Sequence, residues 1–256
     1  MSSTAPGRWR RGWILTLGLA VALAWRPGSA ADPAPKVAPP TETVVDADGN
    51  LYPTIQIGKQ IWTALNLRTT RLNDGTPIPL ATETAVWKDN TTPLFCYPKD
   101  MSATNFVPRF GLLYNFYAVE TKKLAPRGWH VPTAQEWLEF EKHLIASGAN
   151  WDGSRTGDKI AKAICAQTDW NPSPLAGAIG NDLSRNNATG FSAFGTGFRH
   201  ESGIWEPSGR YTGWWTATAV SSDHAGMIDL HYNQADWSNA HHYRSACGYP
   251  VRLVKD

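Results

Sequence analysis

The chain has 256 residues, of which 42% are hydrophobic and 18% are charged, which excludes wholesale disorder, a polytopic membrane protein and a collagen-like fibre. Thirteen tryptophans are several times the ordinary usage, so aromatic packing or aromatic ligand contacts must be prominent. The formal net charge of +2 gives no basic excess of the kind that nucleic-acid binding requires.

The first 31 residues have the pattern of a cleaved export signal. Three arginines within residues 8–11 precede an apolar run at 12–25, and the small residues 29–31 suit cleavage. At ~1.5 Å per residue the run reaches ~21 Å, short of the ~30 Å hydrocarbon layer of a membrane. We therefore expect export to the periplasm, the cell surface or the medium, without a membrane span after cleavage.

A linker separates this leader from the folded domain. Residues 32–43 are rich in proline and alanine and cannot pack a core, so the domain is expected over 44–256. Removing the leader takes four of the 24 basic residues, which leaves 20 against 22 acidic ones.

The domain begins with strand and turn signals. Residues 44–45, 51–57 and 60–64 favour strands, and the Gly58-Lys59 pair favours a turn. The acidic segment Asp46-Ala-Asp-Gly-Asn50 resembles part of a calcium loop, but it lacks the third acidic ligand and the bidentate glutamate of an EF-hand. We interpret it as a hairpin turn.

Helix signals follow a long polar stretch. Residues 65–105 are dense in Asn, Asp, Thr and Pro and are expected to form an ordered loop region, whereas residues 110–119 have apolar side chains at helical spacing. The clearest helix opens with a capping box of Thr133 and Glu136, continues with an apolar stripe and stops at Gly148.

The second half of the chain favours strands. After a short helix predicted over 158–165, four segments have strand character between turn-forming clusters: 194–199, 213–218, 227–232 and 251–254. Helices in the first half and strands in the second predict an α+β class and one loop-rich domain.

The three cysteines leave two alternatives open. Cys96, Cys165 and Cys247 are an odd number, so at most one internal bridge can form in an exported protein, either Cys165–Cys247 or Cys96–Cys247. We favour three buried free thiols, because unpaired cysteine behaves as a small apolar residue.

Several segments resemble the Fibrobacter succinogenes major paralogous domain, a family of exported bacterial proteins. They run in family order over essentially the whole domain: Asp48-Gly-Asn50, Ile55-Gln-Ile-Gly-Lys-Gln-Ile-Trp62, Asn66-Leu-Arg-Thr-Thr70, Asn73-Asp-Gly-Thr-Pro-Ile-Pro79, Leu113-Tyr-Asn-Phe-Tyr-Ala-Val119, Gly128-Trp-His-Val-Pro-Thr133, Gly190-Phe-Ser-Ala193, Trp214-Trp215-Thr216 and Gly248-Tyr-Pro-Val-Arg252.

The resemblance implies a C-type-lectin-like fold, in which two main helices flank a small, twisted, mostly antiparallel sheet with long loops. The same superfamily includes the formylglycine-generating enzymes. Ala125 and Leu253 stand where members often have cysteine, so the bridge of that pair is not expected here.

The chain offers no convincing catalytic or metal centre, and we expect no cofactor. Formylglycine-type chemistry needs a pair of thiolates for copper, but only Cys247 lies in the matching region. Residues 205–208 and 236–239 only partly match the calcium-binding trios of C-type lectins, and His231, His241 and His242 have no acidic partner at a known ligand spacing.

Aromatic and polar residues of the C-terminal half remain as the candidate ligand-binding surface. Because neighbouring strand residues point to opposite faces, Trp214 and Trp215 cannot both point inward from a sheet with one buried face, and at least one tryptophan is expected to be exposed. The candidate ligand-binding residues are Trp205, Trp214, Trp215, Asp236, Trp237, Asn239, Tyr243 and Arg244.

The sequence thus predicts an exported, non-catalytic recognition or adhesion domain that binds a polysaccharide or another cell-envelope component. The alternatives are a formylglycine-generating-enzyme-like oxidase and a structural envelope module that binds only protein. Nucleic acid is not an expected partner, no membrane span is expected after signal cleavage, and the sequence leaves the oligomeric state open.

Overall fold

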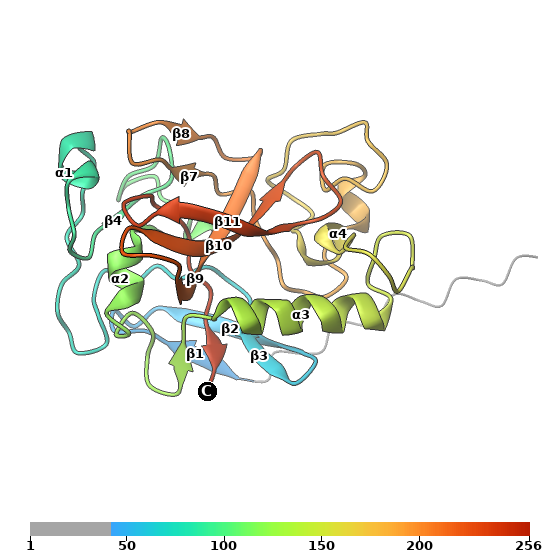
Figure 1. Ribbon diagram of the computed structural model, residues 1–256, viewed down its shortest axis with the longest axis horizontal. Coiled ribbons are helices and arrows are strands. Elements are labelled where there is room, and N and C mark those ends of the chain that lie inside the picture. The colour runs from blue at the N-terminus through green and yellow to red at the C-terminus, as the bar shows by residue number, and fades with distance from the viewer. Residues whose placement is uncertain (1–41) are drawn as a thin grey trace, which may run out of the picture. The chain divides into compact units, whose positions relative to one another are not determined.

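A computed structural model describes residues 42–256, apart from the side chains of residues 239–244. The predicted leader and most of the predicted linker lie outside the described residues. In the part that is described, no helix is long and apolar enough to cross a membrane. The domain is mixed α/β and β-rich, with few helices and antiparallel sheets (Figure 1).

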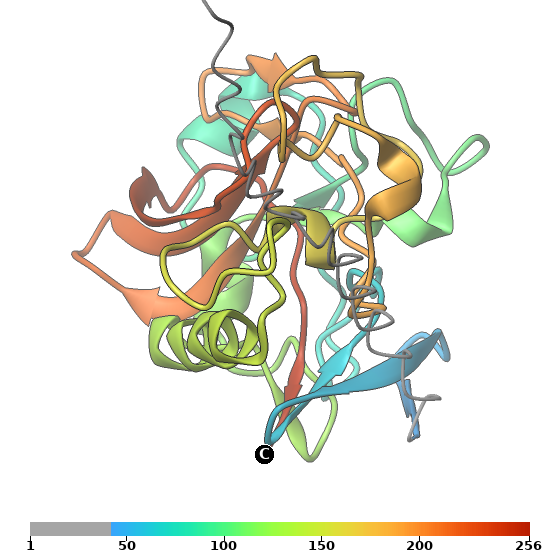
Figure 2. The ribbon, with the colours of Figure 1, turned by 90° about the vertical axis from the view of Figure 1, so that its right-hand side faces the viewer.

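A five-stranded sheet joins the beginning of the domain to its end. Its order is β1-β2-β3-β12-β6, with β1 Thr43–Val45, β2 Leu51–Ile57, β3 Gln60–Thr63, β12 Val254–Lys255 and β6 Trp129–His130. The predicted turn between β1 and β2 is confirmed, and Gly49 there has a φ of +80°, which glycine adopts without steric cost. Val254 pairs with Trp62 and with His130, so β12 lies between β3 and β6 (Figure 2).

The second sheet and one of two short ribbons come from the C-terminal half of the chain, and the other ribbon comes from the first half. The three-stranded sheet has the order β11-β10-β9, with β11 Ser238–Arg244, β10 His224–His231 and β9 Tyr211–Ala219. The ribbons pair β4 Phe95–Cys96 with β5 Leu113–Tyr114, and β7 Phe198–Arg199 with β8 Trp205–Glu206. The shorter helical segments are α1 Thr84–Lys88, α2 Phe116–Glu120, α4 Ala161–Ile164 and two 3₁₀ turns, Pro108–Phe110 and Leu183–Arg185.

Helix α3, Ala134–Ser147, forms as the sequence predicts. The Thr133 hydroxyl accepts a hydrogen bond from the Glu136 amide at 3.2 Å, and the Glu136 carboxylate accepts one from the Thr133 amide at 2.8 Å. Gly148 ends the helix in the left-handed conformation. The buried face of α3 packs against β2 of the larger sheet and against β9 and β10 of the smaller one (Figure 1).

Two large apolar clusters form the core. Trp137 of α3 and Val254 of β12 share one cluster with Trp62 and Trp214, so the capped helix and the last strand enclose a common tryptophan-lined interior. The other cluster includes Trp215 of β9 on the opposite face of the smaller sheet. Both faces of β9 are therefore covered.

Some predicted elements are wrong because long-range pairing overrides the local pattern. Residues 110–119 are not one helix: Leu113–Tyr114 pair with Phe95–Cys96 as strands, and only α2 is helical. The strands expected at 194–199 and 251–254 shorten to β7 and β12. Among the described residues, α3 is the one helix longer than five residues, where the resemblance implied two main helices.

Candidate functional site

The motif residues near the centre of the fold form a buried hub. Asn66, Trp214 and Arg252 are all fully buried. The Asn66 side-chain oxygen accepts hydrogen bonds from Trp214 Nε1 at 2.9 Å and from Arg252 Nε at 2.7 Å. The Asn66 side-chain nitrogen donates to the carbonyl of Phe110 at 2.8 Å. The hub joins segments that are distant in the chain, so these motif residues hold the fold together.

Arg252 supplies the charge of this hub. Its guanidinium donates to the carbonyls of Thr63, Phe191 and Ser192 as well as to Asn66, and it lies 4.4 Å from the centre of the Phe191 ring. All of these hydrogen-bond partners are neutral oxygens. Burial lowers the pKa of Arg252 to about 9, so the side chain stays protonated at pH 7.

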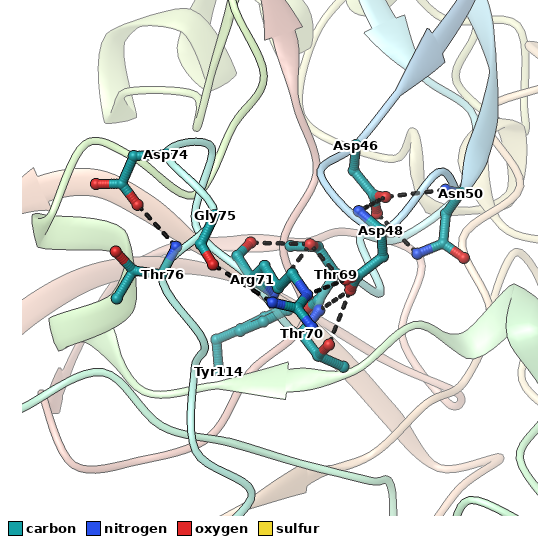
Figure 3. A network of polar contacts seen from close by, with 10 residues as sticks. All are labelled: Asp46, Asp48, Asn50, Thr69, Thr70, Arg71, Asp74, Gly75, Thr76 and Tyr114. Atoms are coloured by element: carbon teal, nitrogen blue, oxygen red, sulfur yellow. Dashed lines mark hydrogen bonds and ion pairs between the residues drawn. The ribbon is translucent and has the colours of Figure 1, made fainter.

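The acidic turn after β1 is a second framework element (Figure 3). The Asp46 carboxylate accepts hydrogen bonds from the amides of Asp48 and Asn50 and from the Tyr52 hydroxyl. The Asp48 carboxylate accepts from the amide and hydroxyl of Thr70 and pairs with Arg71 at 3.2 Å. Donors within the protein thus occupy both carboxylates, and they tie the β1–β2 hairpin to the loop at 69–71.

Most of the predicted aromatic ligand surface lies inside the protein. Trp214 and Trp215 are fully buried and Trp237 is 6% exposed, so these three rings belong to the core and do not form the expected ligand surface. Trp205 is only half-buried. The physical reason is that both faces of β9 are covered, so Trp214 enters one apolar cluster and Trp215 the other.

The structure describes the side chain of one of the four polar candidates. Asp236 is exposed. The side chains of Asn239, Tyr243 and Arg244 lie outside what the structure describes. Of the eight predicted residues, Trp205 is the one that lines a described pocket.

This pocket, which we call the Trp205 pocket, has a volume of about 290 Å³, just below the ~300–1,000 Å³ typical of small-molecule sites. Its walls come from β8, from β4 and the segment that follows it, and from Thr82, which lies shortly before α1. The lining residues are Thr82, Cys96, Tyr97, Pro98, Lys99, Asp100, Met101 and Trp205.

Local structure holds the aromatic wall in place. Trp205 pairs with Arg199 across the β7–β8 ribbon, and its ring lies 5.5 Å from the Arg199 guanidinium carbon. On the other wall, the Tyr97 ring packs edge-on against Phe95 and Phe106. These contacts restrict the movement of the Trp205 and Tyr97 rings. Both rings line the pocket together with the polar side chains of Thr82, Lys99 and Asp100.

Sequence reasoning missed the segment 97–101, which supplies most of this pocket. Its one local signal is an aromatic ring followed by Pro98 and the opposite charges of Lys99 and Asp100 within a loop, where binding residues often lie. Nothing local to that segment indicates that the β7–β8 ribbon packs beside it.

All three cysteines are buried, and Cys96 and Cys165 are free thiols. Burial raises the pKa values of Cys96 and Cys165, which keeps both side chains in the thiol form at neutral pH. Within the described residues, no group of three or more His, Cys, Asp and Glu side chains is arranged to hold a metal ion.

His130 is a conspicuous titratable group away from the pocket. Its Nδ1 lies 2.6 Å from an Asp256 carboxylate oxygen and its Nε2 lies 2.7 Å from a Glu136 carboxylate oxygen. Partial burial lowers the pKa of His130, but the hydrogen bonds to Asp256 and Glu136 outweigh that effect, so the pKa is raised above 6.5.

This arrangement predicts that His130 stabilises the fold below about pH 6.5 and that its contribution is lost as pH rises through the raised folded pKa. Urea unfolding of the His130→Gln variant and of the unmodified chain, each at pH 5.5 and 8.5, measures this contribution. The variant should lose more unfolding free energy, relative to the unmodified chain, at pH 5.5 than at pH 8.5. His143→Gln, at an exposed position of α3, is the control. An equal loss for His130→Gln at both pH values would contradict the prediction.

The fold and the hub define a β-rich α/β domain whose motif residues build a framework, with a pocket formed between its loops and a short ribbon. Residues 55–255 match the family model of the Fibrobacter succinogenes major domain, so the chain belongs to this family. No curated protein and no solved structure matches the chain.

Proposed function

We propose that the protein is an exported, non-catalytic recognition domain that binds a glycan in the Trp205 pocket. The observation that carries the proposal is the pairing of a half-buried tryptophan with polar side chains at a pocket of about 290 Å³. The leader pattern at residues 1–31 supports export, which places the domain where polysaccharides and envelope glycans occur.

The chemistry of the lining suits a sugar ring. A pyranose has apolar C–H faces that pack on an aromatic ring and hydroxyl groups that need hydrogen-bond partners. Trp205 and Tyr97 offer the aromatic surface, while Thr82, Lys99 and Asp100 offer donors and acceptors. The Arg199 guanidinium lies against the Trp205 ring and already restricts its movement. The ring therefore loses less conformational freedom when a ligand binds than an unsupported side chain would.

We also propose that the scaffold is of the C-type-lectin type. The pairing of β12 with β3 supports this, because it brings the two ends of the domain together and leaves the long intervening loops to carry the binding surface. The position of the pocket beside the loop at 97–101 fits the same arrangement.

A glycan-array screen of the purified full-length chain tests the function, and titration calorimetry then measures affinity for the oligosaccharides that bind. Trp205→Ala should weaken binding at least about tenfold, because the aromatic ring of a pocket carries a large share of binding energy. The variant should keep its fold, since Trp205 is only half-buried.

Trp151→Ala is the matched control, because this half-buried tryptophan is not part of the pocket. Its affinity should equal that of the unmodified chain. Undiminished binding by a folded Trp205→Ala variant, or an array without any bound glycan, would overturn the proposal. An array without binding would favour the protein-only module that the sequence leaves as an alternative.

A further inference from the structure

Arg199 is a buried charge that has no carboxylate partner among the described residues. It is 1% exposed. Its terminal nitrogens donate to the carbonyls of His200 and Thr82 and to the Thr84 hydroxyl, all of which are neutral. Its Nε is buried and has no hydrogen-bond partner. A guanidinium that is buried away from water is normally paired with an anion. Arg199 lacks this counter-charge, so a bound anion would stabilise it.

Two of the residues that contact Arg199 are walls of the Trp205 pocket. Thr82, which accepts one of its hydrogen bonds, lines the pocket, and so does Trp205, whose ring lies 5.5 Å from the guanidinium carbon. On another side lies Trp87, with its ring centre at 4.9 Å. The charge is therefore held directly behind the pocket, where a low-dielectric surrounding weakens its field less than water would.

The other charges near the pocket do not cancel Arg199. Lys99 and Asp100 line the pocket, carry opposite charges and offset one another. Glu206 follows Trp205 on strand β8, so its side chain points to the opposite face of the ribbon. The exposed Glu83 lies close enough to act on Arg199, but no ion pair joins the two side chains in the described part of the chain. The net charge facing a ligand is therefore positive.

We propose that the Trp205 pocket selects a glycan unit that carries a carboxylate, a uronic-acid residue, and that Arg199 determines this preference. The inference rests on the proposed glycan-binding function and specifies its substrate class. The sugar ring packs against Trp205 and Tyr97, while its carboxylate lies in the positive field of Arg199, beside the offsetting charges of Lys99 and Asp100. The two indoles beside Arg199 offset part of its charge, which lets the guanidinium remain buried while the pocket is empty.

Titration calorimetry with the full-length chain tests the preference. The probes are a galacturonic-acid trisaccharide and its methyl ester, which have the same sugar rings but differ in charge. The acid should bind about tenfold more tightly than the ester, and most of this ratio should persist in 0.5 M NaCl, because a buried charge is screened less than an exposed one. Equal affinities, or tighter binding of the ester, would overturn the inference while leaving the glycan-binding function intact.

Variants assign the preference to Arg199. Arg199→Met should abolish the difference between acid and ester, whereas Arg199→Lys should retain part of it. Asp100→Asn, at an exposed position, should increase the acid preference about two- to threefold because it removes a like charge from the pocket, and Lys99→Gln should reduce it without abolishing it.

The surface variants keep the test decisive if Arg199→Met does not fold. An unchanged acid preference in Asp100→Asn, or its complete loss in Lys99→Gln, would assign the preference to something other than Arg199. Failure of both trisaccharides to bind would overturn the uronic-acid inference, and the array screen with Trp205→Ala would then decide separately whether the pocket binds glycans at all.

Discussion

Replacing Arg252 by methionine is expected to lower the free energy of unfolding by about 3–5 kcal/mol, as the loss of one member of a buried polar network does. The variant leaves the carbonyls of Thr63, Phe191 and Ser192 without the donor that the guanidinium supplies. Each buried acceptor that loses its partner costs about 1–3 kcal/mol, and relief of the buried charge offsets part of the sum. Thermal unfolding should shift down by roughly 6–20 °C for a domain of this size.

The conservative variant Arg252→Lys separates charge from geometry. Lysine keeps the charge but cannot reach all four oxygens in a planar fork, so it should recover only part of the lost stability. Arg109→Met is the matched control, because Arg109 pairs with Asp169 at 3.0 Å on the surface. That change should cost no more than about 1 kcal/mol. A loss at Arg252 no larger than the loss at Arg109 would show that the hub does not hold the fold together.

Local signals explain the parts of the fold that the sequence predicts correctly. The capping box of Thr133 and Glu136 and the C-cap at Gly148 act within one turn of the helix ends. Both can therefore be recognised from the sequence without knowledge of the tertiary structure. The hairpin turn after Val45 is similar, because the Asp46 carboxylate bonds to amides two and four residues further on.

Long-range contacts explain what the sequence does not predict. Leu113–Tyr114 have helical spacing with their neighbours, yet they pair with a strand almost twenty residues earlier, and the amide of Tyr114 donates to the carbonyl of Tyr249. Near the end of the domain, the carbonyl of Val251 accepts from the Leu67 amide at 2.8 Å instead of joining a ladder. Such partners depend on the arrangement of the whole domain.

The candidate site was only partly predictable for the same reason. The tryptophan content indicated aromatic contacts correctly, but it could not show that both faces of β9 are covered, which buries Trp214 and Trp215. Trp205 differs because its two-residue strand lies in a ribbon near the surface. Its partner wall, Tyr97 to Met101, belongs to a loop whose position depends on the β4–β5 pairing.

Replacing Trp215 by alanine should therefore destabilise the domain by about 3–5 kcal/mol without removing a ligand contact. The indole packs edge-on against Phe116 and Tyr249, at 5.6 Å and 4.9 Å between ring centres. Its Nε1 donates to the carbonyl of Tyr114 at 2.7 Å. Alanine would leave a cavity in the core that this rigid surrounding cannot fill. Urea unfolding at pH 7 measures the loss, and Trp215→Phe should restore more than half of it by filling most of the volume.

The comparison with Trp205 decides which tryptophan serves the ligand. Trp205→Ala should weaken glycan binding with a small loss of stability, whereas Trp215→Ala, assayed at a temperature where it remains folded, should bind with nearly unchanged affinity. The opposite pattern, a stable Trp215→Ala variant that no longer binds glycan, would mean that the face of β9 carrying Trp215 opens to a ligand. Its burial and its hydrogen bond to Tyr114 argue against that outcome, because the indole would have to leave both to reach a sugar.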